Sequence, residues 1–167
     1  TPRHIIKMMV ELMKPSLKDI VCDPAMGSAG FLVETAKYIQ EHYKNELSEK
    51  EKLKHYQNGL LHGFVTDSTM LRIGAMNLML HGVDNPDIEY KDTLSTDNTD
   101  ENKYTLCLAN PPFSGSLDNG AVSKSLLSIT KTKKTELLFM ALFVRMLQVG
   151  GRCASIVPVG VLFGTST

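Results

Sequence analysis

Short apolar runs that alternate with stretches of helical periodicity constrain the fold of this chain more than any other feature. The clearest run, Tyr104–Ala109, carries apolar side chains on both faces, as expected of a strand that is covered on both sides. The pattern predicts strands at residues 19–22, 60–65, 88–90, 104–109 and 153–157, and helices at 2–14, 31–43, 68–81 and 136–148. The alternation predicts an α/β fold with a mostly parallel central sheet flanked by helices, in a single domain over residues 1–167.

Residues 23–30, between the first predicted strand and the next helix, form a turn of small residues. Open parallel sheets bind ligands at the carboxyl ends of their strands. Two glycines let the backbone approach a ligand, and the amide groups that start the helix point at it. The spacing is not the dinucleotide fingerprint, and the acceptor Asp23 suits an ammonium or hydroxyl better than a pyrophosphate. The alternative is a tight turn without a ligand. The candidate binding residues here are Asp23, Pro24, Ala25, Gly27, Ser28, Gly30 and Phe31.

A second candidate site is the segment Asn110-Pro111-Pro112-Phe113, which follows the strand at 104–109. An exocyclic amine on an aromatic ring is a poor nucleophile, because its lone pair is delocalised into the ring. The Asn110 side-chain oxygen and the Pro111 carbonyl could accept both amine hydrogens and stabilise the charge that develops on nitrogen. The prolines stiffen the backbone, and Phe113 offers a face on which a base can stack. These four residues are the catalytic candidates, and a rigid turn is the alternative.

The net charge, the cysteines and the length of the apolar runs exclude several classes of protein. Lys+Arg and Asp+Glu number 18 each, so the formal net charge is zero, which argues against nucleic-acid binding driven by bulk charge. The 3 cysteines lack metal-ligand spacing, so we expect neither a disulfide scaffold nor a metal. No apolar run approaches the roughly 18 residues of a membrane span. The chain looks like an excised segment of a longer protein.

Two polar stretches and the methionines lead to further structural expectations. Residues 44–57 are dense in Lys and Glu and are interpreted as a solvated helix end or loop, with a contact surface as the alternative. Residues 114–134 show no sustained period, so a mobile loop is predicted there. Met8, Met9, Met13, Met70, Met76 and Met79 fall at helical spacing and are expected in the core.

The turn at 23–30 resembles that of a known family. Asp-Pro-Ala-Met-Gly-Ser-Ala-Gly-Phe-Leu looks like the S-adenosylmethionine-binding motif of amino-methylating DNA methyltransferases. It is most similar to the modification (M) subunit of type I restriction systems, whose usual form is Asp-Pro-Ala-Cys-Gly-Thr-Gly-Gly-Phe-Leu. Met26, Ser28 and Ala29 depart from that form conservatively, so the backbone path is expected to be kept. Residues 61–64, 72–78, 80–83 and 150–163 are also similar, which extends the resemblance over nearly the whole chain.

The resemblance implies further cofactor-binding residues. Thr1 and Pro2 look like the family's N-terminal motif, in which Thr and Pro flank the methionine moiety; Thr1 is also expected to cap the first helix. Asp92, followed by Thr93 and Leu94, matches the acid that accepts a hydrogen bond from the cofactor's adenine amine.

One departure concerns the ribose of the cofactor. The family places an acidic residue at the end of the second strand, two residues after a glycine, to hold the ribose hydroxyls. Val65 occupies that position here. Asp67 is the substitute that we expect, and its alternative role is to cap the next helix.

By resemblance, this is the catalytic core of a Rossmann-like class I S-adenosylmethionine-dependent methyltransferase, truncated at both ends relative to the family. The implied activity is site-specific adenine-N6 DNA methylation (class EC 2.1.1.72) on a base flipped out of double-stranded DNA. S-adenosyl-L-methionine is the implied cofactor and S-adenosylhomocysteine the product, with no metal. The implied partners are a specificity (S) subunit and a restriction (R) subunit, in a bacterial or archaeal cytoplasm, without a membrane.

Two alternatives stay open at this point. Protein-glutamine N5 methyltransferases also use Asn-Pro-Pro followed by an aromatic residue, although usually with Tyr there and with a different glycine turn. A non-catalytic scaffold that binds only cofactor or partner is the third hypothesis, and the departure at Val65 keeps it open.

Overall fold

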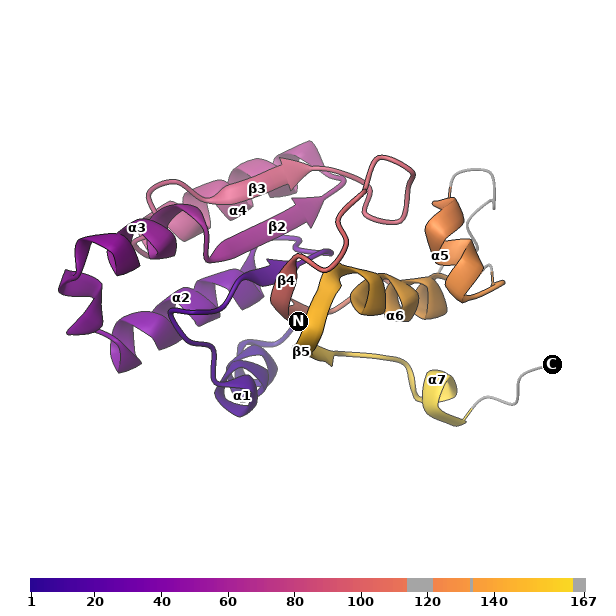
Figure 1. Cartoon of the computed structure of the whole chain (residues 1–167), viewed down its shortest axis with the longest axis horizontal. Coiled ribbons are helices and arrows are strands. Elements are labelled where there is room, and N and C mark those ends of the chain that lie inside the picture. Colours follow the sequence, from indigo (N-terminus) through magenta and orange to yellow (C-terminus); the bar gives the residue numbers. More distant parts are fainter. Residues whose placement is uncertain (114–121, 133, 164–167) are drawn as a thin grey trace.

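The computed structural model describes residues 1–113, 122–132 and 134–163 of the chain. It contains a five-stranded sheet in the order β3-β2-β1-β4-β5, and every neighbouring pair of strands is parallel (Figure 1). The prediction of a parallel α/β fold is confirmed. The strands are β1 (Val21–Asp23), β2 (Leu61–Val65), β3 (Asp87–Tyr90), β4 (Tyr104–Ala109) and β5 (Leu147–Ser155).

Helices cover both faces of this sheet. One hydrophobic cluster joins α1 (Arg3–Met13), α2 (Gly30–His42) and α4 (Ser68–Leu80) to one face, where it includes Val21. A second cluster joins α5 (Lys124–Ile129) and α6 (Thr135–Met146) to the other face, where it includes Cys22. Because successive residues of a strand point to opposite faces, this two-sided cover explains why the central strands are apolar without alternation.

The strand order places the region where ligands are expected. From β1 the chain adds β2 and β3 on one side, and then returns to add β4 and β5 on the other side of β1. The order therefore reverses between β1 and β4, and the crevice outside the carboxyl ends of these strands is the usual ligand position in open α/β sheets. The turn at 23–30 and the segment Asn110–Phe113 both leave the sheet at this edge.

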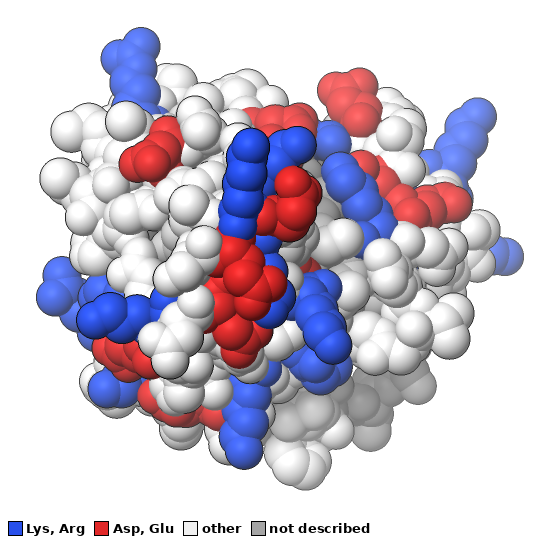
Figure 2. Space-filling model, turned by 60° about the vertical axis from the view of Figure 1, so that its left-hand side comes forward, with Lys and Arg blue, Asp and Glu red and all other residues white. Residues whose placement is uncertain are grey.

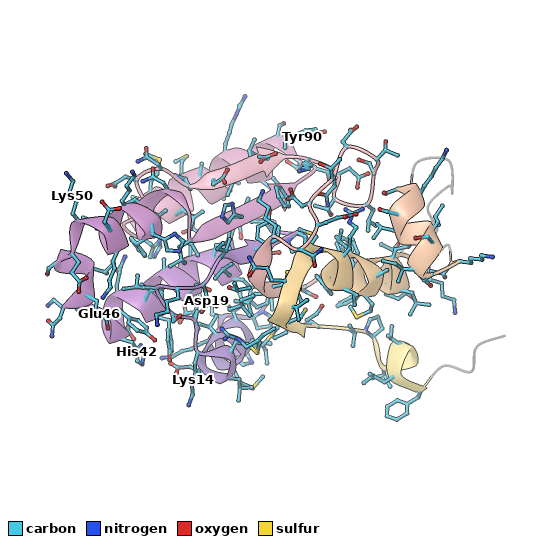
Figure 3. All side chains as sticks on the ribbon, in the orientation of Figure 1. Lys14, Asp19, His42, Glu46, Lys50 and Tyr90 are labelled. Atoms are coloured by element: carbon cyan, nitrogen blue, oxygen red, sulfur yellow. The ribbon has the colours of Figure 1, made fainter. Side chains whose placement is uncertain are left out.

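Asp19, labelled in Figure 3, lies at the amino-terminal ends of the strands, and its side chain is buried. Its carboxylate accepts hydrogen bonds from Ser16, from the Thr105 hydroxyl at 2.7 Å and from the Arg152 guanidinium at 3.2 Å. Burial alone would raise the pKa of Asp19, but the bonds from Thr105 and Ser16 and the charge of Arg152 lower it below its ordinary value. This cluster joins the starts of β1 and β4 to β5.

The charged stretch at 44–57 is more ordered than predicted. It contains a 3-10 turn, η1 (Glu46–Ser48), and helix α3 (Lys50–Asn58). Tyr56 of α3 is buried, and its hydroxyl accepts a hydrogen bond from Gln40 of α2 at 2.7 Å. The other residues of α3 are exposed or half-buried, and Figure 2 shows acidic and basic side chains interspersed on this side of the molecule. A single buried tyrosine is too weak a pattern to identify a helix in advance.

Other expectations need correction. Helix α1 begins at Arg3 with Pro2 as its N-cap, and no side chain caps it, so the predicted capping role of Thr1 is wrong. Residues 124–129 form α5 within the predicted loop, while 114–121 and 133 lie outside the described residues. Met8 of α1 and Met76 and Met79 of α4 are exposed, so their predicted place in the core is wrong. In α4 only Gly74 and Leu78 are buried.

The carboxyl-terminal part of the chain also differs in detail. Helix α6 ends at Met146 and β5 begins directly at Leu147, where the sequence predicted helix to residue 148. A short helix, α7 (Val159–Phe163), follows β5. No helix in the described residues is long and apolar enough to cross a membrane. The cysteines at positions 22, 107 and 153 are free thiols, as expected.

Candidate functional site

Two cavities of about 450 and 220 Å³ lie at the carboxyl ends of the strands and share Ala25 and Gly27 of the first turn. They therefore form one cradle around that turn. The larger cavity contains these predicted residues: Pro24, Ala25, Gly27, Asp67, Asp92, Thr93, Leu94 and Pro112. The smaller cavity contains these: Thr1, Asp23, Ala25, Gly27, Ser28, Gly30, Phe31 and Asn110. Pro2, Pro111 and Phe113 adjoin the cradle in sequence but line neither cavity.

The first turn has the open backbone that its glycines predicted. Gly27 has φ +54°, and a Cβ placed there would meet nothing within 4 Å, so the backbone at this residue borders open space in the cradle. Ala29 adopts the left-handed conformation, with φ 65°, immediately before α2. That conformation costs an L-residue about 1 kcal/mol. The turn is therefore shaped so that the start of α2 faces the smaller cavity.

Met26 of this turn depends on two glycines elsewhere in the sequence. Its side chain is buried. A Cβ on Gly63 of β2 would collide with the Met26 sulfur, and a Cβ on Gly74 of α4 would lie 2.8 Å from the Met26 methyl carbon. Because Gly63 and Gly74 have no Cβ, the Met26 thioether fits between them. This explains how the turn accommodates Met where the related motif has Cys.

Asp23 ends β1 and lies at the smaller cavity. It is 1% exposed, and its Oδ1 accepts a hydrogen bond from the Ala25 amide at 3.0 Å. Burial raises the pKa of the Asp23 carboxyl to about 7, although the bond from Ala25 opposes the shift. A cationic group bound beside Asp23 would offset this burial cost by stabilising the carboxylate. The Asp23 carboxylate, as a buried acceptor, therefore fits a ligand that carries an ammonium group.

Asn110 follows β4 and meets the amino-terminal residue of the chain. Its Nδ2 donates to the Thr1 hydroxyl at 2.8 Å. Its Oδ1 is shielded from solvent and has no hydrogen-bond partner among the described residues. A buried acceptor without a partner costs roughly 1–3 kcal/mol. Asn110 therefore offers an oriented, unpaired acceptor in the smaller cavity, while Phe113 is 46% exposed.

Asp67 and Asp92 line the larger cavity after β2 and β3. The Asp67 Oδ1 accepts from the amides of Thr69 and Met70 at 2.7 and 3.0 Å, so Asp67 is the N-cap of α4. The capping alternative for Asp67 is thus confirmed, and Oδ2 forms no hydrogen bond in the described residues. The Asp92 Oδ1 accepts from the Leu94 amide at 3.0 Å.

The larger cavity also includes residues that the sequence did not single out. Thr66 and Lys91 follow β2 and β3, and the Lys91 ammonium lies 4.6 Å from the centre of the Phe64 ring. Thr135 and Phe139 come from α6. Position after a strand could have indicated Thr66 and Lys91, but no sequence signal points to the α6 pair. The described residues contain no group of three or more His, Cys, Asp or Glu that could hold a metal ion.

Comparisons with known proteins agree with this geometry. The chain is 33% identical over 172 residues to the type I restriction enzyme EcoKI methylase subunit of Escherichia coli K12, covering 98% of this chain and 31% of that protein. The crystal structure of the EcoKI M protein superposes with a TM-score of 0.86 at 30% identity, over 97% of this chain and 34% of that one. A modification subunit of a type I restriction enzyme from Vibrio vulnificus YJ016 gives a TM-score of 0.80 at 31% identity, over 99% and 35%.

These matches confirm the resemblance seen in the sequence and the Rossmann-like methyltransferase fold. The chain spans about a third of the length of the relatives it matches. The comparisons favour a DNA methylase over a protein-glutamine methyltransferase, because the family model that matches the chain describes DNA methylases. That model, N-6 DNA Methylase, matches residues 1–167, and the chain therefore belongs to this family.

Proposed function

We propose that this chain is the catalytic core of a type I modification subunit, which methylates N6 of adenine at a specific DNA site. The observation that carries the proposal is the Asn110 Oδ1: a buried, unpaired acceptor in the cavity beside the first turn. An unpaired acceptor at the end of a strand is unfavourable in the free protein, and an amine hydrogen would satisfy it.

S-adenosylmethionine is the cofactor that the cradle fits. Asp23 would hold its ammonium group, with Thr1, Ser28 and Gly30 around the methionine moiety in the smaller cavity. The adenosine moiety would occupy the larger cavity, with Asp67 accepting from the ribose and Asp92 from the adenine amine. The bound cofactor would supply a methyl group already activated by its sulfonium, so the chain needs no nucleophile of its own.

The work left to the protein is to bind, orient and polarise the target amine. The Asn110 Oδ1 and the Pro111 carbonyl would each accept one amine hydrogen, which frees the nitrogen lone pair and stabilises the positive charge that develops. Pro112 keeps this backbone rigid, and the exposed face of Phe113 would stack on the flipped base, worth about 1–3 kcal/mol. Flipping the base costs a few kcal/mol, which stacking partly offsets.

The proposed partners are double-stranded DNA, a specificity subunit that reads its sequence and a restriction subunit. The formal net charge of zero is compatible with a core that leaves the main DNA grip to another subunit. The proposed location is the bacterial or archaeal cytoplasm, where chromosomal DNA is accessible.

The test is methylation by the full-length subunit with its specificity partner, using methyl-labelled S-adenosylmethionine and DNA that carries the recognised site. We expect the label on N6 of adenine in one sequence context. Label on cytosine, or on a release-factor-like peptide and not on DNA, would refute the proposal. The non-catalytic alternative predicts no transfer of the label. Calorimetric titration of the same sample with the cofactor then shows whether cofactor binding is retained.

A further inference from the structure

Arg145 of α6 is the one Lys or Arg side chain that is buried in the described residues, and it faces loops of the site. It is 8% exposed. One terminal nitrogen donates to the Ser125 hydroxyl at 2.7 Å and to the Ser123 hydroxyl at 3.2 Å, and the other donates to the Asn98 carbonyl oxygen at 2.9 Å. Its guanidinium therefore joins α6 to two segments that are distant in sequence, the loop after β3 and the start of α5.

The charge of Arg145 is not matched by an adjacent carboxylate. No ion pair within 4.0 Å is formed by Arg145 in the described residues, and its Nε is buried without a hydrogen-bond partner. Burial lowers the pKa of Arg145, an effect that the more distant Glu101 and Asp100 oppose. Burying a charge without a counter-ion is costly, and a neutral side chain would fill this position without that cost. Hydrogen bonds to three neutral acceptors, the hydroxyls of Ser123 and Ser125 and the Asn98 carbonyl oxygen, offset part of this cost.

The bond to Asn98 continues to the cofactor turn. Asn98 is 1% exposed, and its side-chain amide donates to the Thr93 carbonyl oxygen at 2.9 Å. The Thr93 hydroxyl donates to the Pro24 carbonyl oxygen at 3.1 Å. A continuous series of buried hydrogen bonds therefore runs from α6, through the loop that carries Asp92, to the turn that follows β1.

The bonds to the two serines reach the other side of the site. The Ser123 amide donates to the Leu94 carbonyl oxygen at 2.9 Å, and Val122 pairs with Ser95 in an antiparallel bridge. The chain that leaves the sheet after Asn110–Phe113 thus returns at Val122 directly against the loop of the larger cavity. Arg145 bonds both segments of this junction, the loop at Asn98 and the start of α5 at Ser123 and Ser125.

We propose that Arg145 is a positioning residue, which holds the loop at 92–98 and the start of α5 in one fixed arrangement around the larger cavity. Its guanidinium has donors in a planar fork that can reach both segments at once, whereas a lysine ammonium is a point donor. The inference rests on the proposed function, since it concerns loops of the same site, but Arg145 itself lines neither cavity. It acts on ligand binding through Leu94, Asn98 and Ser123.

The test uses the full-length subunit with its specificity partner and compares Arg145→Lys with the double variant Ser123→Ala/Ser125→Ala. The lysine keeps the charge, and the alanines remove two hydroxyl acceptors together with the 2.9 Å hydrogen bond between those hydroxyls, so both changes are mild. Ser128→Ala is the matched control, because its hydroxyl donates on the same helix to the Ser125 carbonyl oxygen and does not bond Arg145. The readouts are amide hydrogen exchange of residues 92–98 and 122–126, the dissociation constant for S-adenosylmethionine, and kcat.

Loss of one hydrogen bond to a charged group corresponds to a factor of about ten or more. We expect Arg145→Lys and the double variant to accelerate exchange at both segments and to weaken cofactor binding about tenfold, with the smaller effect on kcat. Ser128→Ala should leave all three unchanged. Exchange and affinity within twofold of wild type for Arg145→Lys would overturn the proposal, as would a fall in thermal stability with unchanged affinity of the folded protein. If no DNA is methylated but exchange and affinity change as expected, the proposed function fails and the role of Arg145 stands.

Discussion

The side-chain amide of Asn110 donates a hydrogen bond to the hydroxyl of Thr1 across 109 positions of sequence, at 2.8 Å. This contact uses the donor half of the amide and leaves the acceptor half, Oδ1, without a partner in the described residues. Thr1 therefore orients Asn110, the residue that we propose accepts a hydrogen bond from the target amine. Two motifs that the sequence treats as separate meet in one site.

Replacing Thr1 tests this orientation. In the full-length subunit we expect Thr1→Val to lower kcat about fivefold, because the isosteric side chain cannot accept from Nδ2, and a lost hydrogen bond is worth roughly 1 kcal/mol. Thr1→Ser keeps the hydroxyl and should retain most of the activity. Steady-state kinetics at saturating cofactor measure both. Equal activity of the valine and serine variants would show that the contact does not position Asn110.

Asn110→Ala removes the acceptor itself. We expect it to abolish methyl transfer while leaving the affinity for S-adenosylmethionine nearly unchanged, since an oxyanion-type or amine-stabilising contact acts in the transition state. Single-turnover transfer and calorimetric titration on the same preparation separate the two effects. Parallel loss of transfer and binding would assign Asn110 a structural role.

The raised pKa of Asp23 predicts a pH dependence. Its carboxyl has a pKa of about 7 in the fold against an ordinary value of 3.8. Between these values the folded state binds the proton better than the unfolded state does, so the free energy of unfolding falls as pH rises from about 4 to 7. The slope is at most about 1.4 kcal/mol per pH unit. Asp23→Asn should remove this part of the slope.

Chemical denaturation of the wild type and Asp23→Asn at pH 5 and pH 8 measures the difference. We expect the asparagine variant to gain stability relative to wild type at the higher pH and to bind the cofactor more weakly, because it cannot carry the negative charge that pairs with an ammonium group. Identical pH profiles for the two proteins would mean that Asp23 ionises as an ordinary carboxyl.

Asp67 has two roles that a serine can separate. Serine is a good N-cap, so Asp67→Ser should keep the stability of α4 within about 0.5 kcal/mol. It lacks the second oxygen that we assign to the ribose, and the affinity for S-adenosylmethionine should fall about tenfold, as for a lost charged hydrogen bond. Thermal denaturation and calorimetry provide the two readouts. Unchanged affinity would leave Asp67 as a cap only and would point to Thr66 for the ribose.

Met26 and Gly63 should behave as a coupled pair. Gly63→Ala places a Cβ against the Met26 sulfur and the Leu32 side chain, and we expect it to destabilise the fold by about 1–3 kcal/mol through overpacking. Adding Met26→Cys shortens the colliding side chain and should recover part of that loss. A double-mutant cycle from denaturant unfolding gives the coupling energy. Strict additivity of the two changes would contradict the contact.

Much of this architecture is predictable from local pattern. Runs of neighbouring apolar residues predict the strands at 60–65, 88–90 and 104–109. The turn at 23–30 is predicted from its own glycines and small residues. Helix α3 was not predicted because Tyr56 is its only buried residue, and that residue packs against α2, which lies earlier in the chain. Met76 and Met79 follow the helical period but lie on a face of α4 that nothing in the described residues covers.

The sequence by itself determined the parallel α/β class, the turn at 23–30 and the Asn-Pro-Pro-Phe segment as candidate sites, because these depend on contiguous residues whose chemistry is explicit. Only the tertiary structure decided that Thr1 bonds Asn110, that Gly63 and Gly74 make room for Met26, and that Arg145 ties the loop at 92–98 to the start of α5. Each of these relationships joins residues far apart in the chain, and its energy comes from burial and hydrogen-bond geometry that exist only after the elements have packed.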